Sequence, residues 1–161
     1  MHLSNVWSAW TIRSQQALES ALPPERSFRD LAALTLIESH PGESVDWLRQ
    51  RVLLTQSGTV RLLDRLEHAG LIERGERLGR NATLHITQAG RDLLRAWYQA
   101  REAAFRSVFA SLSPEEQTIA VTFMETMLKG EPRVRAEADH LCSTCDWDGC
   151  ETCPVHQSVP V

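Results

Sequence analysis

Long apolar runs and familiar catalytic signatures are both missing from this sequence. No run reaches the roughly 18 residues that a membrane span needs, and the N-terminus lacks the charged-then-apolar pattern of a secretory signal. We therefore expect a cytoplasmic protein without membrane contact. No glycine-rich phosphate loop, H-E-x-x-H metal motif or nucleophile elbow occurs either. These absences argue against an enzyme.

Lysine is nearly absent as well, since Lys129 is the only lysine among 17 basic residues. Arginine suits phosphate and guanine recognition through its planar guanidinium group. The net charge of −4 is unevenly distributed along the chain. Residues 49–95 carry nine arginines against five acids, whereas residues 113–161 carry three basic groups against nine acids. The basic middle is therefore compatible with nucleic-acid binding despite the acidic total.

The first 141 residues contain no cysteine, and all four cysteines follow within twelve residues. Such a cluster, in a chain without a signal pattern, indicates a metal site in a reducing compartment and not a disulfide framework. The spacing C-x2-C-x4-C-x2-C predicts a four-thiolate zinc site, with an iron–sulfur cluster as the alternative and a redox-switched dithiol pair as a third reading. The predicted ligands are Cys142, Cys145, Cys150 and Cys153.

Three further residues lie in this cysteine-rich tail. His140 and His156 flank the motif, and we expect both to be bystanders because four thiolates already complete a tetrahedral site. Trp147 is expected to pack the small metal lobe onto a neighbouring helix.

Apolar spacing and capping residues predict a mainly helical chain. A first helix covers residues 3–22, and later helices begin after caps at Ser27, Ser44, Thr55, Thr87 and Ser113. Residues 71–86 instead favour a small β-hairpin with its turn at residues 77–81. Two short helices joined by a tight turn and followed by a hairpin make a winged helix-turn-helix. We expect a mainly α fold with a small β-hairpin wing and a helical dimerisation region.

The helix after Thr55 is the predicted recognition helix, because its small and polar start would let it enter a major groove. Arg61 and Arg65 share a polar face, opposite a face predicted to bury Val60, Leu63 and Leu66. The hairpin tip would enter an adjacent minor groove. The predicted DNA-binding residues are Thr55, Gln56, Ser57, Gly58, Thr59, Arg61 and Arg65 of the helix and Arg77, Arg80 and Asn81 of the wing.

Residues 54–90 also resemble the MarR family of bacterial transcriptional regulators. The shared motifs are LDRLE at residues 63–67, GLIER at residues 70–74 and ITQAG at residues 86–90. The family commonly has an Asp two residues before the wing arginine. Here Leu78 takes that place, so Arg80 lacks an orienting carboxylate.

The resemblance implies a two-fold homodimer on double-stranded DNA, with the first helix and the last two long helices at the interface. It also implies a small aromatic effector, for which Trp10, Phe28 and Trp47 are candidate pocket walls. The apolar surface of the long helix, with Trp97 and Phe105, independently favours a dimer.

We divide the chain into four parts. Residues 1–26 form a dimerisation helix, residues 27–87 the DNA-binding lobe, residues 88–130 further dimerisation helices and residues 131–161 the cysteine-rich tail. The predicted function is a sequence-specific regulator, most simply a repressor, acting on a pseudo-palindromic operator. The tail would be structural or sensing. The alternative is a zinc-stabilised protein-interaction adaptor whose winged helix does not bind DNA.

Overall fold

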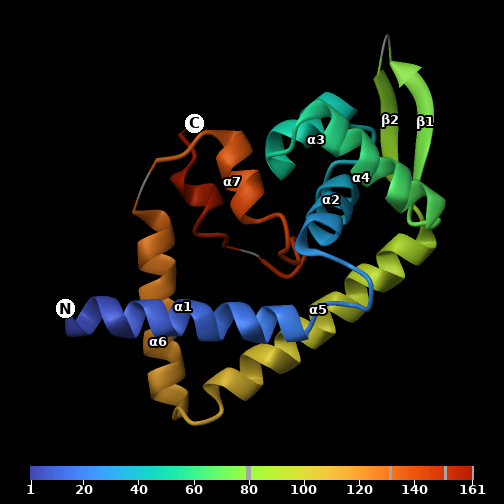
Figure 1. Ribbon diagram of the computed structural model, residues 1–161. Coiled ribbons are helices and arrows are strands. Elements are labelled where there is room, and N and C mark those ends of the chain that lie inside the picture. The colour runs from blue at the N-terminus through green and yellow to red at the C-terminus, as the bar shows by residue number, and fades with distance from the viewer. Residues whose placement is uncertain (79–80, 131, 151, 161) are drawn as a thin grey trace.

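The computed structural model describes residues 1–78, 81–130, 132–150 and 152–160, with the backbone alone for residues 76–78 and 81. Helices dominate this described part, and its one sheet has two antiparallel strands (Figure 1). None of its helices is long and apolar enough to cross a membrane. The predicted fold class, mainly α with a small hairpin, is therefore confirmed.

All five predicted caps lie at helix starts. Ser27 opens α2 (Phe28–Ser39), Ser44 opens α3 (Val45–Val52), Thr55 opens α4 (Gln56–His68), Thr87 opens α5 (Gln88–Phe109) and Ser113 opens α6 (Pro114–Lys129). In each case the hydroxyl oxygen accepts a hydrogen bond from the backbone N–H three residues later, which satisfies a donor that the helix itself leaves unpaired. Single capping residues in the sequence therefore predicted where these five helices begin.

The hairpin pairs β1 (Ile72–Leu78) with β2 (Asn81–Ile86), with Ile72 opposite Ile86 and an irregularity between Arg74 and Arg77. The segment before α3 pairs briefly with β2. Leu84 N–H donates to the Glu43 carbonyl, and Gly42 N–H donates to the Leu84 carbonyl. Figure 1 shows the hairpin projecting beyond α4, as a wing does.

The core of the lobe surrounds α2, whose residues 30–37 are all buried. Side chains from α3, α4, the hairpin and the first turns of α5 close around it. The largest fully buried side chains of this core are Leu31, Leu34, Leu36, Ile37, Leu48, Leu63, Leu66, Ile72, Leu84, Leu94 and Trp97.

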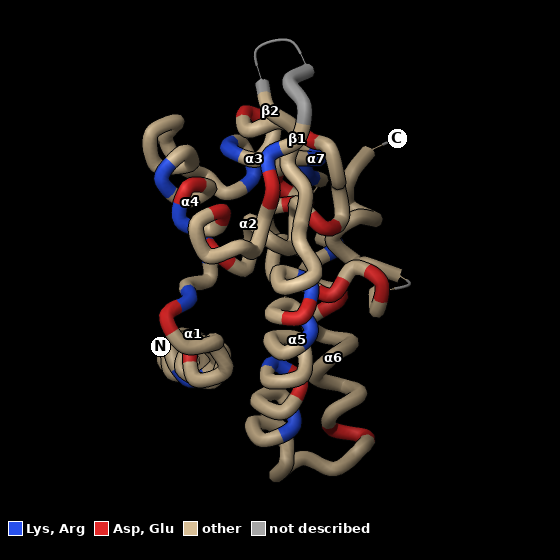
Figure 2. The backbone as a smooth tube through the Cα atoms, turned by 90° about the vertical axis from the view of Figure 1, so that its right-hand side faces the viewer, with Lys and Arg blue, Asp and Glu red and all other residues tan. Residues whose placement is uncertain are grey.

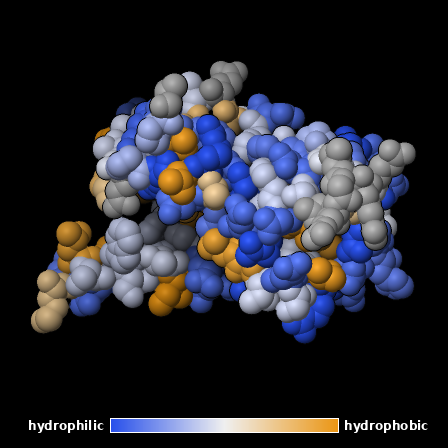
Figure 3. All heavy atoms as spheres, turned by 90° about the horizontal axis from the view of Figure 1, so that it is seen from above, coloured by the Kyte–Doolittle hydropathy of each residue, from blue (hydrophilic) through white to orange (hydrophobic). Residues whose placement is uncertain are grey.

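Two helices lie outside this core and carry exposed apolar side chains. They are α1 (His2–Ser20), which buries only Ala17, and α6, which buries none of its residues. Figure 3 shows orange side chains on the N-terminal helix that projects from the body. The exposed large apolar residues of the two helices are Leu3, Val6, Trp7, Trp10, Ile12, Leu18, Ile119, Val121, Phe123, Met124, Met127 and Leu128.

The tail returns to the lobe after α6. It contains α7 (Arg135–Leu141), the cysteine segment and a short 3-10 turn, η1 (His156–Ser158). Figure 1 shows the tail beside α2 and α3. Ala138, Cys142 and Val155 form a small core of their own, and Trp147 contacts both this core and the main one. The expectation for Trp147 is therefore confirmed.

Candidate DNA-binding surface and cysteine site

The recognition helix α4 starts from a tight turn. Leu53 takes the left-handed backbone conformation (φ 51°) at the end of α3, and Thr55 then caps α4 by accepting from Gly58 N–H. A Cβ on Gly58 would lie 3.1 Å from the Thr55 hydroxyl oxygen, so glycine keeps the cap compact. Gln56 and Ser57 are exposed at the first turn.

The burial of two α4 residues, Thr59 and Val60, differs from the prediction. Thr59 is fully buried and its hydroxyl donates to the Thr55 carbonyl at 3.1 Å, so it is not available to a phosphate. Val60, predicted to be buried, is 39% exposed. Leu63 and Leu66 are buried as predicted, and Thr59 and Leu62 complete the buried stripe in place of Val60.

Arg65 is held by a buried carboxylate. Its Nη2 lies 2.6 Å from Asp30 Oδ1, and Ser27 donates to the same carboxylate through its hydroxyl and its N–H. Burial would raise the pKa of Asp30, but Arg65 and Ser27 outweigh it and lower the pKa. Asp30 therefore stays ionised and ties α4 to the start of α2.

Arg74 of β1 links the wing to α4. Its Nη2 lies 2.5 Å from Asp64 Oδ1 and its Nη1 lies 3.4 Å from Glu67 Oε2. These pairs neutralise acids on the exposed side of the recognition helix. Sequence reasoning missed this role, because Arg74 and Asp64 lie ten positions apart on different elements and no local spacing indicates their pairing.

Most arginines near the lobe are already paired with acids, and Figure 2 shows basic and acidic segments alternating along α4 and α5. Arg61 differs, because its Nε donates only to the Ser57 carbonyl at 3.3 Å. Among the arginines of residues 49–95 whose side chains are described, Arg61 is the one without an ion pair. Of the predicted wing residues, Arg80 lies outside the described residues, and Arg77 and Asn81 are described by their backbone alone.

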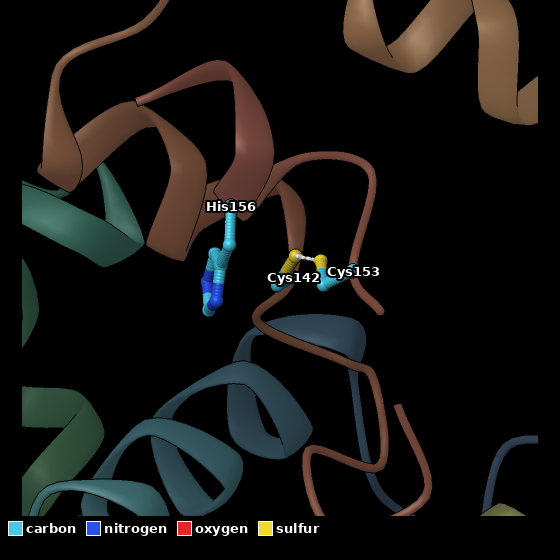
Figure 4. Close-up of side chains that lie close together, drawn as sticks. All are labelled: Cys142, Cys153 and His156. Atoms are coloured by element: carbon cyan, nitrogen blue, oxygen red, sulfur yellow. Dashed lines mark hydrogen bonds between the residues drawn. The ribbon is translucent and has the colours of Figure 1, made fainter. Parts of the chain in front are cut away.

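All four cysteines line one small cavity of about 50 Å³, together with Trp147 and His156. Cys142 Sγ and Cys153 Sγ lie 3.6 Å apart (Figure 4). The thiols also perturb each other. Hydrogen bonding to Cys145, followed by burial, raises the pKa of Cys142, whereas the hydrogen bond from Cys142, aided by Arg101, lowers the pKa of Cys145 to about 7. The four predicted ligands therefore line one cavity, but the ligand atoms that lie within 4.8 Å of one another belong to Cys142, Cys153 and His156.

The two flanking histidines differ. His140 Nδ1 contacts the Arg51 carbonyl at 2.7 Å, which occupies that ring nitrogen. His156 lies beside Cys142 and Cys153, close enough for a shared ion (Figure 4). Its ring packs on Trp147 and its Nε2 lies 3.8 Å from Asp139 Oδ1.

The cysteine-rich tail is fastened to two separate helices. On α3, Arg51 Nε donates to Asp139 Oδ2 at 2.8 Å, and the two side chains are only 9% and 1% exposed. On α5, Trp97 Nε1 and Arg101 Nη1 both donate to the Thr144 carbonyl, at 3.2 and 2.5 Å. The tail thus bridges the helix-turn-helix and the long helix.

The three candidate effector walls do not share a cavity. Trp10 lines a cavity of about 550 Å³ between α1, α5 and α6, and packs edge-on against Phe109. Phe28 packs edge-on against Trp97 in the lobe. Trp47 lies under the Arg51 guanidinium at 3.8 Å. Spacing along the chain did not reveal that Phe28 and Trp47 are used for packing.

Replacing Arg51 tests the ion pair that holds the tail on α3. We predict that Arg51→Ala lowers the free energy of unfolding by about 3–5 kcal/mol, because it removes the hydrogen-bonded cation of the buried Asp139 carboxylate. Arg49→Ala is the matched control on the same helix, since the Arg49–Asp46 pair is exposed and should contribute about 0.5 kcal/mol or less. Urea unfolding at fixed protein concentration measures both. Equal losses for the two variants would contradict the buried ion pair's role.

Comparison with known proteins places this geometry in a known fold. The sequence matches no protein-family model and no curated protein. Its structure is similar to the multiple antibiotic-resistance repressor (MarR) of Listeria monocytogenes, with a TM-score of 0.59 and 26% identity over 79% of this chain and 92% of that one.

Two further structures are similar over nearly their whole length. One is MepR, the transcription regulator of the Staphylococcus aureus multidrug efflux pump MepA, with a TM-score of 0.68, 18% identity, and 81% and 98% of the two chains covered. The other is a MarR family protein of Mycobacterium tuberculosis in complex with p-aminosalicylic acid, with a TM-score of 0.60, 22% identity, and 78% and 97% covered. The chain therefore has the winged helix-turn-helix fold of the MarR family of transcriptional regulators.

Proposed function

We propose that this protein is a DNA-binding transcriptional repressor that acts as a homodimer on a two-fold operator. The observation that carries the proposal is the exposed start of α4, which presents Gln56, Ser57 and Arg61, an arginine without an ion pair. The Arg65–Asp30 ion pair holds this helix on α2. Gln56 and Arg61 would contact base edges, and the hydroxyls of Thr55 and Ser57 would donate to phosphates. Minor-groove contacts by Arg77, Arg80 and Asn81 stay a prediction.

A second copy of the chain would cover the apolar faces of α1 and α6. An exposed face of this size, with Trp7, Trp10 and Phe123 among its residues, is unfavourable in water. The 550 Å³ cavity beside Trp10 opens onto the same face, so we assign it to the dimer interface. A small aromatic effector stays a prediction, for which the p-aminosalicylic acid of the similar Mycobacterium structure is the support.

Replacing Arg61 tests the DNA-binding proposal. We expect the wild type to select a two-fold symmetric sequence from random duplexes, with an affinity that falls steeply as salt rises. Arg61→Ala should cost about 1–3 kcal/mol at the selected site, as measured by fluorescence anisotropy. The control is Arg106→Ala, since Arg106 is an exposed arginine on α5, paired with Glu102.

An equal effect of the two variants would contradict the role of Arg61. Failure to select any sequence, together with weak salt dependence, would contradict DNA binding and favour the adaptor.

We further propose that the four cysteines hold one zinc ion. Zinc–thiolate bonds of about 2.3 Å in a tetrahedron place the sulfurs about 3.8 Å apart, close to the 3.6 Å between Cys142 and Cys153. A cluster would hold sulfurs on different irons farther apart, and a cavity of about 50 Å³ suits a single ion better. A bound divalent ion would offset half of the charge of the four thiolates. In this arrangement His156 packs beside the site and is not a ligand.

Metal analysis tests this assignment. We expect one zinc per chain, no visible iron–sulfur absorption after anaerobic purification, and loss of most zinc in Cys142→Ser or Cys153→Ser. His156→Ala should keep the full zinc content. Iron with acid-labile sulfide, or loss of zinc in His156→Ala alone, would contradict the four-thiolate site.

The contacts of the tail support a sensing role for this site. The Thr144 carbonyl, which lies between the proposed ligands Cys142 and Cys145, accepts hydrogen bonds from Trp97 and Arg101 of α5. The preceding helix α7 is held on α3 through Asp139. Loss of the ion would release this part of the tail and loosen α3, which immediately precedes the recognition helix. Metal state and DNA affinity are therefore coupled in this proposal.

A further inference from the structure

Exposed apolar side chains are unevenly distributed over the molecule. Most lie on α1, α5 or α6, where a second copy of the chain would cover them, and two more, Val134 and Leu141, lie on the tail. Within the described part of residues 27–87, only Leu53 and Val60 are large, apolar and exposed. Both lie at the start of the recognition helix, on the side of the lobe that the proposed function turns towards DNA.

Leu53 is 67% exposed and lies beside the tail. It lines two cavities at the junction between α3 and the tail, and His140 lines both of them. Its position at the left-handed turn before α4 also explains why it cannot turn inward with α3. The junction with the tail therefore accounts for Leu53 without a ligand.

Val60 lies in a different setting. It lies one turn after Gln56 and Ser57 and one turn before Asp64, all three exposed, and it lines none of the cavities described above. Buried residues flank it on the other side, at Thr59 and Leu63. Its two methyl groups thus stand within a polar, groove-facing strip. A β-branched side chain has little rotational freedom in a helix, so a contact made by Val60 costs little ordering entropy.

We propose that Val60 determines operator specificity by contacting the C5-methyl group of a thymine in each half-site. Among the base edges in the major groove, the thymine methyl is the apolar group, and short apolar side chains contact it. Gln56 lies four residues earlier on the same strip and can pair with an adjacent adenine. This inference rests on the proposed DNA binding and adds to it the base that the recognition helix reads.

Replacing thymine by deoxyuridine removes only this methyl group, so it tests the contact directly. We expect one symmetric pair of thymines in the selected operator at which deoxyuridine weakens wild-type binding about fourfold per half-site, from the transfer free energy of one buried methyl. Val60→Ala should bind the thymine operator more weakly and show no difference between thymine and deoxyuridine at that pair. The other thymines of the operator serve as controls.

The outcomes separate this inference from the proposed function. A wild type that binds its operator but tolerates deoxyuridine at every thymine would overturn the role of Val60 and leave DNA binding intact. Retention of the full deoxyuridine effect in Val60→Ala would overturn it as well. Absence of any selected DNA would overturn both. Circular dichroism confirms folding of the variant, since Val60 is exposed and its truncation leaves no buried cavity.

Discussion

The buried ion pair between Arg51 and Asp139 is the contact on which the arrangement of the tail depends. Its 2.8 Å hydrogen bond joins α3 to α7 in an apolar setting, with the Arg51 guanidinium lying over Trp47. Removing either charge would leave the other buried without its hydrogen-bonded counter-ion, so the pair specifies one position of the tail more than it adds stability. From that position the Thr144 carbonyl reaches Trp97 and Arg101, and the tail connects α3 with α5.

Local chemistry made much of the fold predictable. Each capping residue acts within three residues of its own position, so the helix starts at Ser27, Thr55 and Thr87 could be read without tertiary information. The hairpin followed from its alternation and turn residues. The error at Val60 arose because three- and four-residue steps from Leu63 and Leu66 fit more than one apolar stripe, and packing against α2 selected Thr59 instead.

The candidate site was predictable where its residues are close in sequence and hidden where they are distant. The cysteine spacing indicated a shared site, and the four side chains do line one cavity. The pairing of Arg51 with Asp139 spans 88 positions and leaves no pattern in the sequence. The sequence predicts a DNA contact for Arg65 but not its pairing with a carboxylate 35 positions earlier, which only the packing of α4 on α2 reveals. Tertiary ion pairs therefore determine which of the described arginines have no acidic partner and can contact DNA.

We propose that the cysteine site controls the order of the helix-turn-helix through these contacts. Amide hydrogen exchange before and after removal of the metal by a chelator tests it most directly. Removal of the metal should speed exchange in residues 142–153 and, through Asp139, in α3 as well. Unchanged exchange in α3, with acceleration limited to the cysteine segment, would contradict the coupling.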